Sequence, residues 1–338
     1  MTLRALYDVP APAKLNLFLH VVGRRTDGYH LLQSLFVLVD WADRLHFERR
    51  DDGGLFRHDL RLGHGGQGAA GLVLPAEDLC VRAARVLQAA SGCALGAEIH
   101  LEKQLPAGAG MGGGSSDAAT TLLALNRLWG LNWPRARLAE LGLQLGADVP
   151  FFIGGENAFV EGIGERLTPV AVPTLSYAVV KPPVSIETRS IFTHPLLRRD
   201  TEPVILAGSS GGRGSEPAAD PGETGLQPSR GASTETVEPA KWAAEGLGRN
   251  DLQPPAEDRC PEVAQAARWL EARFGNSRMT GSGSAVFARV VTKPGTAASP
   301  EAMSAPVEAP GFPAGLPAGW VGRMCKGLAR HPLVHWAD

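Results

Sequence analysis

The chain has 338 residues, which is enough for two lobes because single domains usually hold about 100 to 200 residues. Hydrophobic residues make up 44% and charged residues 20%, a composition typical of a folded enzyme and not of a disordered or fibrous chain. The net charge of -2 gives no field that would gather nucleic acid or an anionic membrane. The N-terminal segment lacks the apolar core of a signal peptide, and no apolar run approaches the roughly 18 residues of a membrane span. We therefore expect a cytoplasmic protein, a monomer or weak homodimer, whose partner is a small-molecule substrate, with no nucleic acid and no membrane.

The first part of the chain alternates between predicted strands and one clear helix. Residues 13–22 (AKLNLFLHVV) and 30–41 (HLLQSLFVLVDW) read as strands joined by the turn-rich GRRTDGY, which predicts a hairpin. Residues 97–103 predict another strand, and residues 116–129 predict a helix that Gly130 ends. Strand, glycine loop and helix therefore follow one another in the chain.

The later elements are also mixed in type: helices over 134–146 and 261–274, and strands over 158–161, 176–181 and 285–291. Because strict βαβ spacing is absent, this order favours an α+β fold with antiparallel strands over a doubly wound parallel sheet. Two stretches, 208–240 and 293–319, consist mostly of Gly, Pro, Ala, Ser and Glu and cannot bury enough apolar surface to offset their ordering entropy. We expect both to be flexible surface insertions that the chemistry does not need.

The most informative motif is the glycine-rich loop LPAGAGMGGGSSDAA, which follows a predicted strand and opens a predicted helix. Glycines let several backbone N–H groups point inward together, and the helix N-terminus adds partial positive charge, so residues 106–116 suit phosphate oxygens. Ser115 and Ser116 add hydroxyls for a phosphate or a magnesium ion, or one of them is the helix N-cap. The loop lacks the lysine of a Walker A motif, and no acid follows at about 20 residues, where a dinucleotide fold needs one. A flexible glycine turn is the structural alternative.

Two charged residues in apolar surroundings are candidates for catalysis. Lys14 and Asn16 share one face of the first strand, which is explained either by a solvated sheet edge or by a cleft. Asp148, in LGADVPFFIGG, either caps a short helix with Pro150 in its first turn or accepts the proton of a substrate hydroxyl. In the second case the Lys14 ammonium keeps the Asp148 carboxylate ionised, and the pair activates an alcohol.

Three further features carry weaker signals. Tyr29 and His30 follow a turn, where a histidine is by default a surface residue, yet together they offer a stacking face and a hydrogen-bonding tip for a planar ligand. The second glycine-rich stretch, TGSGS at 280–284, is by itself only a tight turn before a strand. The four cysteines lie far apart without metal-ligand spacing, which predicts reduced, mostly buried thiols.

Taken together, AKLNLFL, GRRTDGYH, LPAGAGMGGGSSDAA, LGADVPFFIGG and MTGSGSAVFA resemble the ordered motifs of the GHMP kinase superfamily. More narrowly, they resemble its kinases of CDP-linked methylerythritol, in the non-mevalonate isoprenoid pathway. The resemblance covers residues 13–192 and the chain from 250 to the C-terminal KGLARHPL. It implies a two-lobe α+β fold with an N-terminal ATP-binding lobe (1–171), a C-terminal ferredoxin-like substrate-binding lobe (172–338), and the active site between them. It further implies ATP and magnesium as cofactors, and transfer of the γ-phosphoryl group to the 2-hydroxyl of the CDP-linked substrate.

The resemblance also implies roles for single residues. Lys14 and Asp148 match the catalytic pair, with Asp148 as general base. The ATP phosphate loop matches Pro106, Ala107, Gly108, Ala109, Gly110, Met111, Gly112, Gly113, Gly114, Ser115 and Ser116. The residues that hold the cytidine-bearing substrate match Asn16, Tyr29, His30, Thr188 and Phe192, the last as an aromatic face for cytosine. The metal ligands stay open.

Two alternatives compete with this interpretation. One is a GHMP kinase for another substrate, such as homoserine or mevalonate, and the other is a relative that binds ligand without catalysis. The DGYH motif and the aromatic residue of SIETRSIF argue for a cytidine, and the presence of both Lys14 and Asp148 argues against a dead enzyme. The two insertions depart from a compact family member and leave the assembly open.

Overall fold

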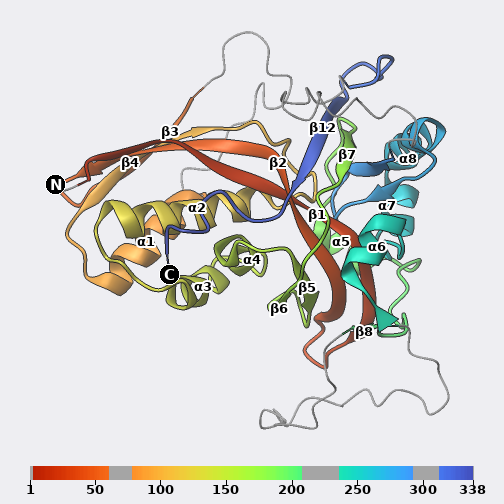
Figure 1. The fold of residues 1–338 in the computed structure, drawn as a ribbon, viewed down its shortest axis with the longest axis horizontal. Coiled ribbons are helices and arrows are strands. Elements are labelled where there is room, and N and C mark those ends of the chain that lie inside the picture. The colour runs from red at the N-terminus through yellow and green to blue at the C-terminus, as the bar shows by residue number, and fades with distance from the viewer. Residues whose placement is uncertain (1–2, 61–77, 208–235, 292–311, 338) are drawn as a thin grey trace, which may run out of the picture.

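The computed structural model describes residues 3–60, 78–207, 236–291 and 312–337. Two long antiparallel strands, β1 (Ala5–Arg24) and β2 (His30–Arg50), run through both halves of the molecule (Figure 1). The predicted hairpin is confirmed, and both strands extend further than their apolar cores. The extension of β2 alternates buried and more exposed residues, so it still presents one apolar face to the core although it carries many charges.

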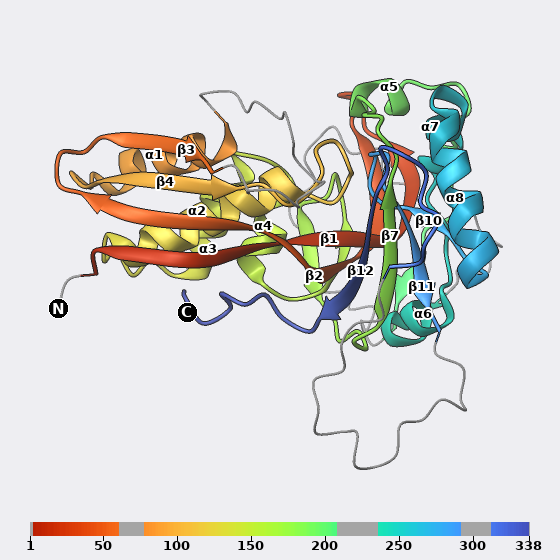
Figure 2. The ribbon, with the colours of Figure 1, turned by 90° about the horizontal axis from the view of Figure 1, so that it is seen from above.

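The first lobe is a sheet covered on one face by helices (Figure 2). Strand β4 (Gly96–Glu102) pairs antiparallel with β2, and the short β3 (Leu55–Asp59) pairs parallel with β4 at the edge. Four helices pack here: α1 (Leu79–Ser91), α2 (Gly113–Leu128), α3 (Arg135–Leu143) and α4 (Val149–Gly154). Helix α2 is buried along most of its length and forms the centre of this hydrophobic core.

The second lobe continues the same sheet. Its strand order is β10 (Arg278–Met279), β11 (Val286–Val290), β7 (Ser176–Lys181), β12 (Val321–Leu328) and then β2. The β5 (Ala158–Glu161) and β6 (Arg166–Pro169) hairpin pairs with β2 at residues 34–36, next to the two residues of β2 that pair with β12. Helices α5 (Thr188–Phe192), α6 (Pro239–Glu245), α7 (Gln253–Arg259) and α8 (Pro261–Phe274) lie in this lobe, together with the short pair β8 (Ile205–Leu206) and β9 (Thr236–Val237) (Figures 1 and 2). The predicted α+β fold with mainly antiparallel strands is confirmed.

Packing does not follow chain order. Leu19 and Val21 of β1 lie in the core of the second lobe with α8, whereas Leu333 near the C-terminus lies in the core of the first lobe. The predicted boundary between the two domains at residue 171 therefore stays a prediction. In the structure, β1 and the C-terminal segment connect the two lobes. Within the described residues, no helix is long and apolar enough to cross a membrane.

The two predicted insertions are partly wrong in extent. Residues 208–235 and 292–311 lie outside the described residues. The remaining parts are ordered: Val237 of β9 is fully buried, and Phe312 stacks on Trp269 with ring centroids 5.7 Å apart. The Trp269 indole N–H also donates to the Gly315 carbonyl at 3.1 Å. The composition of these stretches did not predict the contacts of Val237 and Phe312, because a single aromatic or aliphatic residue is enough to pack a polar segment against the core.

Candidate active site

The glycine-rich loop lines a pocket of about 480 Å³. Every predicted loop residue from Pro106 to Ser115 contributes to its wall, together with Lys103, Asp117 and the first residues of α1. Helix α2 begins inside the loop, at Gly113, so its free N–H groups lie at the end of the glycine run. A pocket with this wall presents backbone donors and a helix N-terminus to an anion, which suits phosphate.

The loop is a fixed structure and not a flexible turn. Gly110 has a left-handed backbone (φ +77°), and a Cβ there would lie 2.3 Å from the carbonyl oxygen of Thr280. The second glycine-rich stretch lies against it, since Ser284 N–H donates to Gly108 O and Ala285 N–H donates to Ala109 O. The 280–284 stretch is therefore more than a tight turn: it supports the phosphate-loop backbone from the second lobe.

One predicted loop residue, Ser116, is not among the residues that line the pocket. Ser116 is fully buried, its hydroxyl donates to the Pro12 carbonyl at 2.7 Å, and its N–H donates to Gly112 O. Neither group is free for a phosphate or a metal ion. The serine N-cap alternative is also wrong, because Gly112 occupies the N-cap position in a left-handed conformation. Ser115 lines the pocket, as predicted.

Lys14 and Asp148 come together beside the loop. The Lys14 N–H donates to Met111 O at 3.0 Å, and its Nζ lies 3.5 Å from Asp148 Oδ2. The ammonium also donates to Asn16 Oδ1 at 2.5 Å and lies 4.3 Å from the centre of the Phe36 ring. Burial lowers the pKa of Lys14, and the Asp148 charge opposes that shift. The solvated-edge alternative is wrong, because Lys14 and Asn16 are only 3% and 0% exposed.

Asp148 lies where a helix cap would lie, but it does not cap. It precedes α4 with Pro150 in the first turn, as the sequence predicted, yet its backbone is helical and its side chain accepts no capping hydrogen bond within the described chain. The carboxylate faces Lys14 instead and is 29% exposed. This partial exposure leaves room for a substrate hydroxyl at the carboxylate.

A line of polar contacts leads from this pair to the predicted substrate residues. The Asn16 N–H donates to Thr280 Oγ1 at 2.9 Å, and in the same 280–284 stretch Ser282 Oγ lies 2.8 Å from Thr188 Oγ1. Thr188 begins α5, the short helix that ends at Phe192. The structure thus places Asn16 and Thr188 on two sides of one supporting loop.

His30 and Phe192 form an aromatic pair. Their ring centroids are 5.0 Å apart with an interplanar angle of 30°, and Arg199 Nε donates to His30 Nε2 at 3.3 Å. Burial and then the Arg199 charge lower the pKa of His30, which favours the neutral ring. The default interpretation of His30 was a surface histidine beside a turn, and the structure shows it partly buried and stacked on Phe192. Its neighbour Tyr29 is 61% exposed. A planar base fits against this pair better than a small aliphatic substrate does.

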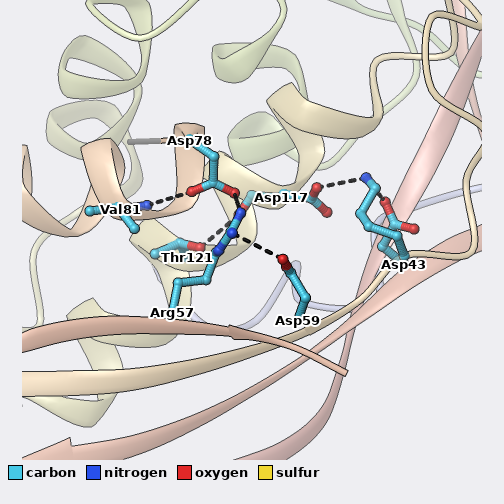
Figure 3. Close-up of polar contacts among 8 residues, drawn as sticks. Asp43, Arg57, Asp59, Asp78, Val81, Asp117 and Thr121 are labelled. Carbon is cyan, nitrogen blue, oxygen red and sulfur yellow. Dashed lines mark hydrogen bonds and ion pairs between the residues drawn. The ribbon is translucent and has the colours of Figure 1, made fainter. Parts of the chain in front are cut away.

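Sequence reasoning missed a buried ion network at the back of the pocket. The Lys103 ammonium donates to Asp43 Oδ2 and, at 2.9 Å, to Asp117 Oδ2 (Figure 3). Asp43 is fully buried, and its Oδ1 accepts the N–H groups of Gln104 and Leu105 at 2.6 and 2.7 Å. Asp43 therefore fixes both the lysine and the chain that enters the phosphate loop. Lys103 precedes Pro106 by three residues, and this closeness to the glycine-rich loop was the sequence feature that could have identified it as part of the site.

Asp117 is the unusual member of this network. Its Oδ1 is buried and has no hydrogen-bond partner among the described residues. Burial, together with the charge of Asp43, raises the pKa of Asp117 to about 8 although Lys103 opposes the shift. Burial lowers the pKa of Lys103, but attraction and hydrogen bonds to Asp117 and Asp43 outweigh it and raise the pKa overall, so the network keeps a cation in the pocket wall.

Comparisons with known proteins give the family. Residues 78–156 match the GHMP kinase N-terminal domain and residues 223–301 the GHMP kinase C-terminal domain. The chain is 55% identical over 337 residues to "4-diphosphocytidyl-2-C-methyl-D-erythritol kinase" of Methylibium petroleiphilum, covering 100% of both chains. The chain belongs to the 4-diphosphocytidyl-2-C-methyl-D-erythritol kinase family of GHMP kinases. A protein of Variovorax paradoxus with the same name is 49% identical over 99% of this chain and 100% of its own.

Solved structures agree with this family. A crystal structure of 4-(cytidine 5'-diphospho)-2C-methyl-D-erythritol kinase superposes with a TM-score of 0.62 at 33% identity, covering 83% of this chain and 89% of its own. Homoserine kinase from Cytophaga hutchinsonii gives a TM-score of 0.55 at 16% identity, with 86% and 85% of the chains covered. The second likeness supports the fold alone. The expected GHMP kinase fold is confirmed.

Proposed function

We propose that the chain transfers the γ-phosphoryl group of ATP to the 2-hydroxyl of 4-diphosphocytidyl-2-C-methyl-D-erythritol, within isoprenoid biosynthesis. The names of its relatives support this substrate. The observation that carries the chemistry is the distance of 3.5 Å between Lys14 Nζ and Asp148 Oδ2. Lys14 lies on β1, and its backbone N–H is hydrogen-bonded to Met111 of the glycine-rich loop. An alcohol bound at Asp148 therefore lies beside the nucleotide phosphates.

The residues divide the reaction between positioning and proton transfer. Asp148 accepts the hydroxyl proton as the substrate oxygen bonds to the γ-phosphorus and the bond from that phosphorus to the bridging oxygen of ADP breaks. Lys14 places positive charge next to the carboxylate and the transferring group. Backbone N–H groups of residues 106–115 hold the phosphates, and Lys103 adds a cation to the pocket wall.

The pocket wall offers one hydroxyl oxygen that would suit a magnesium ion, that of Ser115. The Ser115 hydroxyl lies 3.9 Å from where a Cβ of Gly146 would stand, two residues before Asp148. Magnesium takes one or two protein oxygens together with substrate phosphates and water, so Ser115 is the protein ligand we propose. The ion would neutralise phosphate charge during transfer.

On the substrate side, His30 and Phe192 would bind the cytosine base, and Tyr29 and Thr188 would line the path from the base to the reacting hydroxyl. Asn16 is fully buried and would act on the substrate through Lys14, whose ammonium it holds. Homoserine or mevalonate would leave the His30–Phe192 pair unused. This pair is the feature that favours the cytidyl substrate over the other GHMP substrates.

The test is ATP consumption by the purified chain with three acceptors: the cytidyl substrate, homoserine and mevalonate. We expect ADP release only with the first, and phosphorus NMR of the product should show a new phosphomonoester on the erythritol carbon skeleton. ADP release with homoserine or mevalonate instead would refute the substrate, and none with any acceptor would favour a non-catalytic relative.

A further inference from the structure

Three histidines form a row on the outer face of the first-lobe sheet. The strand register pairs His46 of β2 with His100 of β4, and His100 with His58 of β3. The neighbouring row pairs Glu48 with Glu98. The residues that alternate with them on β2 and β4 lie in the hydrophobic core, so these side chains project on the face opposite that core. The register thus gathers imidazoles and carboxylates from three strands.

Two of these imidazoles converge on one carboxylate oxygen. Nε2 of His58 lies 3.8 Å and Nε2 of His100 lies 3.9 Å from Glu98 Oε2, while the two rings stack with centroids 4.9 Å apart. Glu48 adds a second carboxylate, since ligand atoms of Glu48, Glu98 and His100 all lie within 4.8 Å of one another. These separations are too long for hydrogen bonds. The ligand atoms of Glu48, Glu98 and His100 therefore lie around a common space, and His58 approaches it at Glu98 Oε2.

Both carboxylates are oriented by a second residue. Arg50 Nη1 donates to Glu98 Oε1 at 2.5 Å, which leaves Oε2 for the histidines. The Tyr7 hydroxyl donates to Glu48 Oε1 at 2.9 Å. In metalloproteins, carboxylate ligands are held by outer hydrogen bonds of this kind. Arg50 and Tyr7 thus fix the direction in which the remaining oxygens point.

We propose that His58, His100, Glu98 and Glu48 form a binding site for Zn²⁺ or a chemically similar late first-row divalent ion. Imidazole nitrogen with carboxylate oxygen is a donor set that such ions prefer, whereas Mg²⁺ and Ca²⁺ favour oxygen alone. Ligands about 2.1 Å from a tetrahedral zinc ion lie about 3.4 Å apart. The two histidine nitrogens would approach Glu98 Oε2 by about half an ångström, and side-chain rotation would bring in Glu48, whose ligand atom lies within 4.8 Å of those of Glu98 and His100.

The site would fasten the edge of the first lobe. Strand β3 pairs only with β4 among the described strands, and an ion held by His58 and His100 would bridge the two. On the opposite face of β3, Arg57 Nη1 donates to Asp78 Oδ2 at 2.9 Å, and Asp78 caps α1 at the wall of the nucleotide pocket (Figure 3). The bound ion would therefore stabilise a strand that supports the pocket without entering it.

The test uses the full chain, stripped with a chelator and then titrated with Zn²⁺ by calorimetry and with Co²⁺ by visible absorption. The double variant His58→Gln/His100→Gln removes both nitrogens of the site. His46→Gln is the matched control, because His46 lies in the same row but its Nδ1 accepts from Asp8 N–H and its Nε2 lies 3.4 Å from Glu102. Circular dichroism and kinase turnover establish that each variant is folded.

We expect the double variant to lose about tenfold or more in Zn²⁺ affinity, and the control to bind within about twofold of the unmodified chain. The Co²⁺ spectrum should show nitrogen and oxygen ligands without a thiolate charge-transfer band. Zn²⁺ should raise the Tm of the unmodified chain and of the control but not of the double variant. Equal affinity in all three proteins, or a thiolate band that accounts for the binding, would overturn the proposal.

Discussion

Replacing Asp148 by Asn tests the catalytic pair most directly. Two unit charges 3.5 Å apart attract by about 5 kcal/mol at an effective dielectric constant of about 20, before any desolvation cost is subtracted. The variant keeps the shape of the side chain but removes both this attraction and the proton acceptor. We expect turnover to fall about a hundredfold or more, the range for loss of a general base, while ATP affinity stays nearly unchanged.

The same variant has a second signature in its pH profile. Burial already lowers the pKa of Lys14, and the Asp148 charge is what opposes that shift. In the variant the pKa of Lys14 falls further, so the alkaline limb of the turnover profile moves toward neutral pH. A coupled ADP-release assay across pH measures this shift, with Asp200→Asn as the control because that side chain is 87% exposed. Near wild-type turnover, or an alkaline limb that does not move, would refute the pair.

Three other substitutions test separate parts of the site. Phe192→Ala should raise the KM for the cytidyl substrate far more than the KM for ATP, and the reverse ranking in steady-state kinetics would contradict the base-stacking role. Gly283→Ala would place a Cβ 2.2 Å from the Gly110 nitrogen, so it should lower the free energy of unfolding in urea by about 1–3 kcal/mol and weaken ATP binding. The control Gly154→Ala has open space around it and should do neither. Equal effects of the two substitutions would contradict a role for the contact between Gly283 and the glycine-rich loop. The pKa of Asp117 is about 8 in the folded protein against 3.8 when unfolded, so the folded state holds the proton more tightly between these values. The free energy of unfolding should therefore fall as pH rises from about 4 to 8, by at most about 1.4 kcal/mol per pH unit, and Asp117→Asn should abolish this fall. Urea titrations at several pH values that show the same pH dependence in both proteins would contradict the prediction.

Features encoded by local pattern were predictable from the sequence. The 158–161 and 176–181 strands and the 261–274 helix have the predicted bounds, because apolar periodicity and turn residues mark them. Helix α1 was missed although its signals are present: Asp78 accepts the Val81 N–H as N-cap, and Gly92 ends the helix in a left-handed conformation. The buried face of α1, which includes Val81 and Leu87, is as periodic as that of α8, so this helix was predictable from its own residues.

Features encoded by contacts between distant segments were not predictable without a known family. Asp43 reads as one charge among several in the second half of β2, and only the fold shows that it is fully buried against Lys103. Ser116 reads as equivalent to Ser115, yet one helical step turns its hydroxyl to Pro12 and away from the pocket. The sequence suggested which residue types meet, whereas the direction of each side chain followed from packing between elements.

The arrangement explains why the pair and the phosphate loop can act together. Lys14 is attached to the loop by its own backbone, through the bond to Met111, and the loop is attached to the second lobe by the backbone bonds of Ser284 and Ala285. The Asn16 N–H is in turn bonded to Thr280 of that same stretch. Lys14, the glycine-rich loop and Asn16 are thus parts of one hydrogen-bonded unit that spans both lobes. Since phosphoryl transfer depends on holding the attacking oxygen and the phosphate in line, this shared backbone support is what the fold contributes to catalysis.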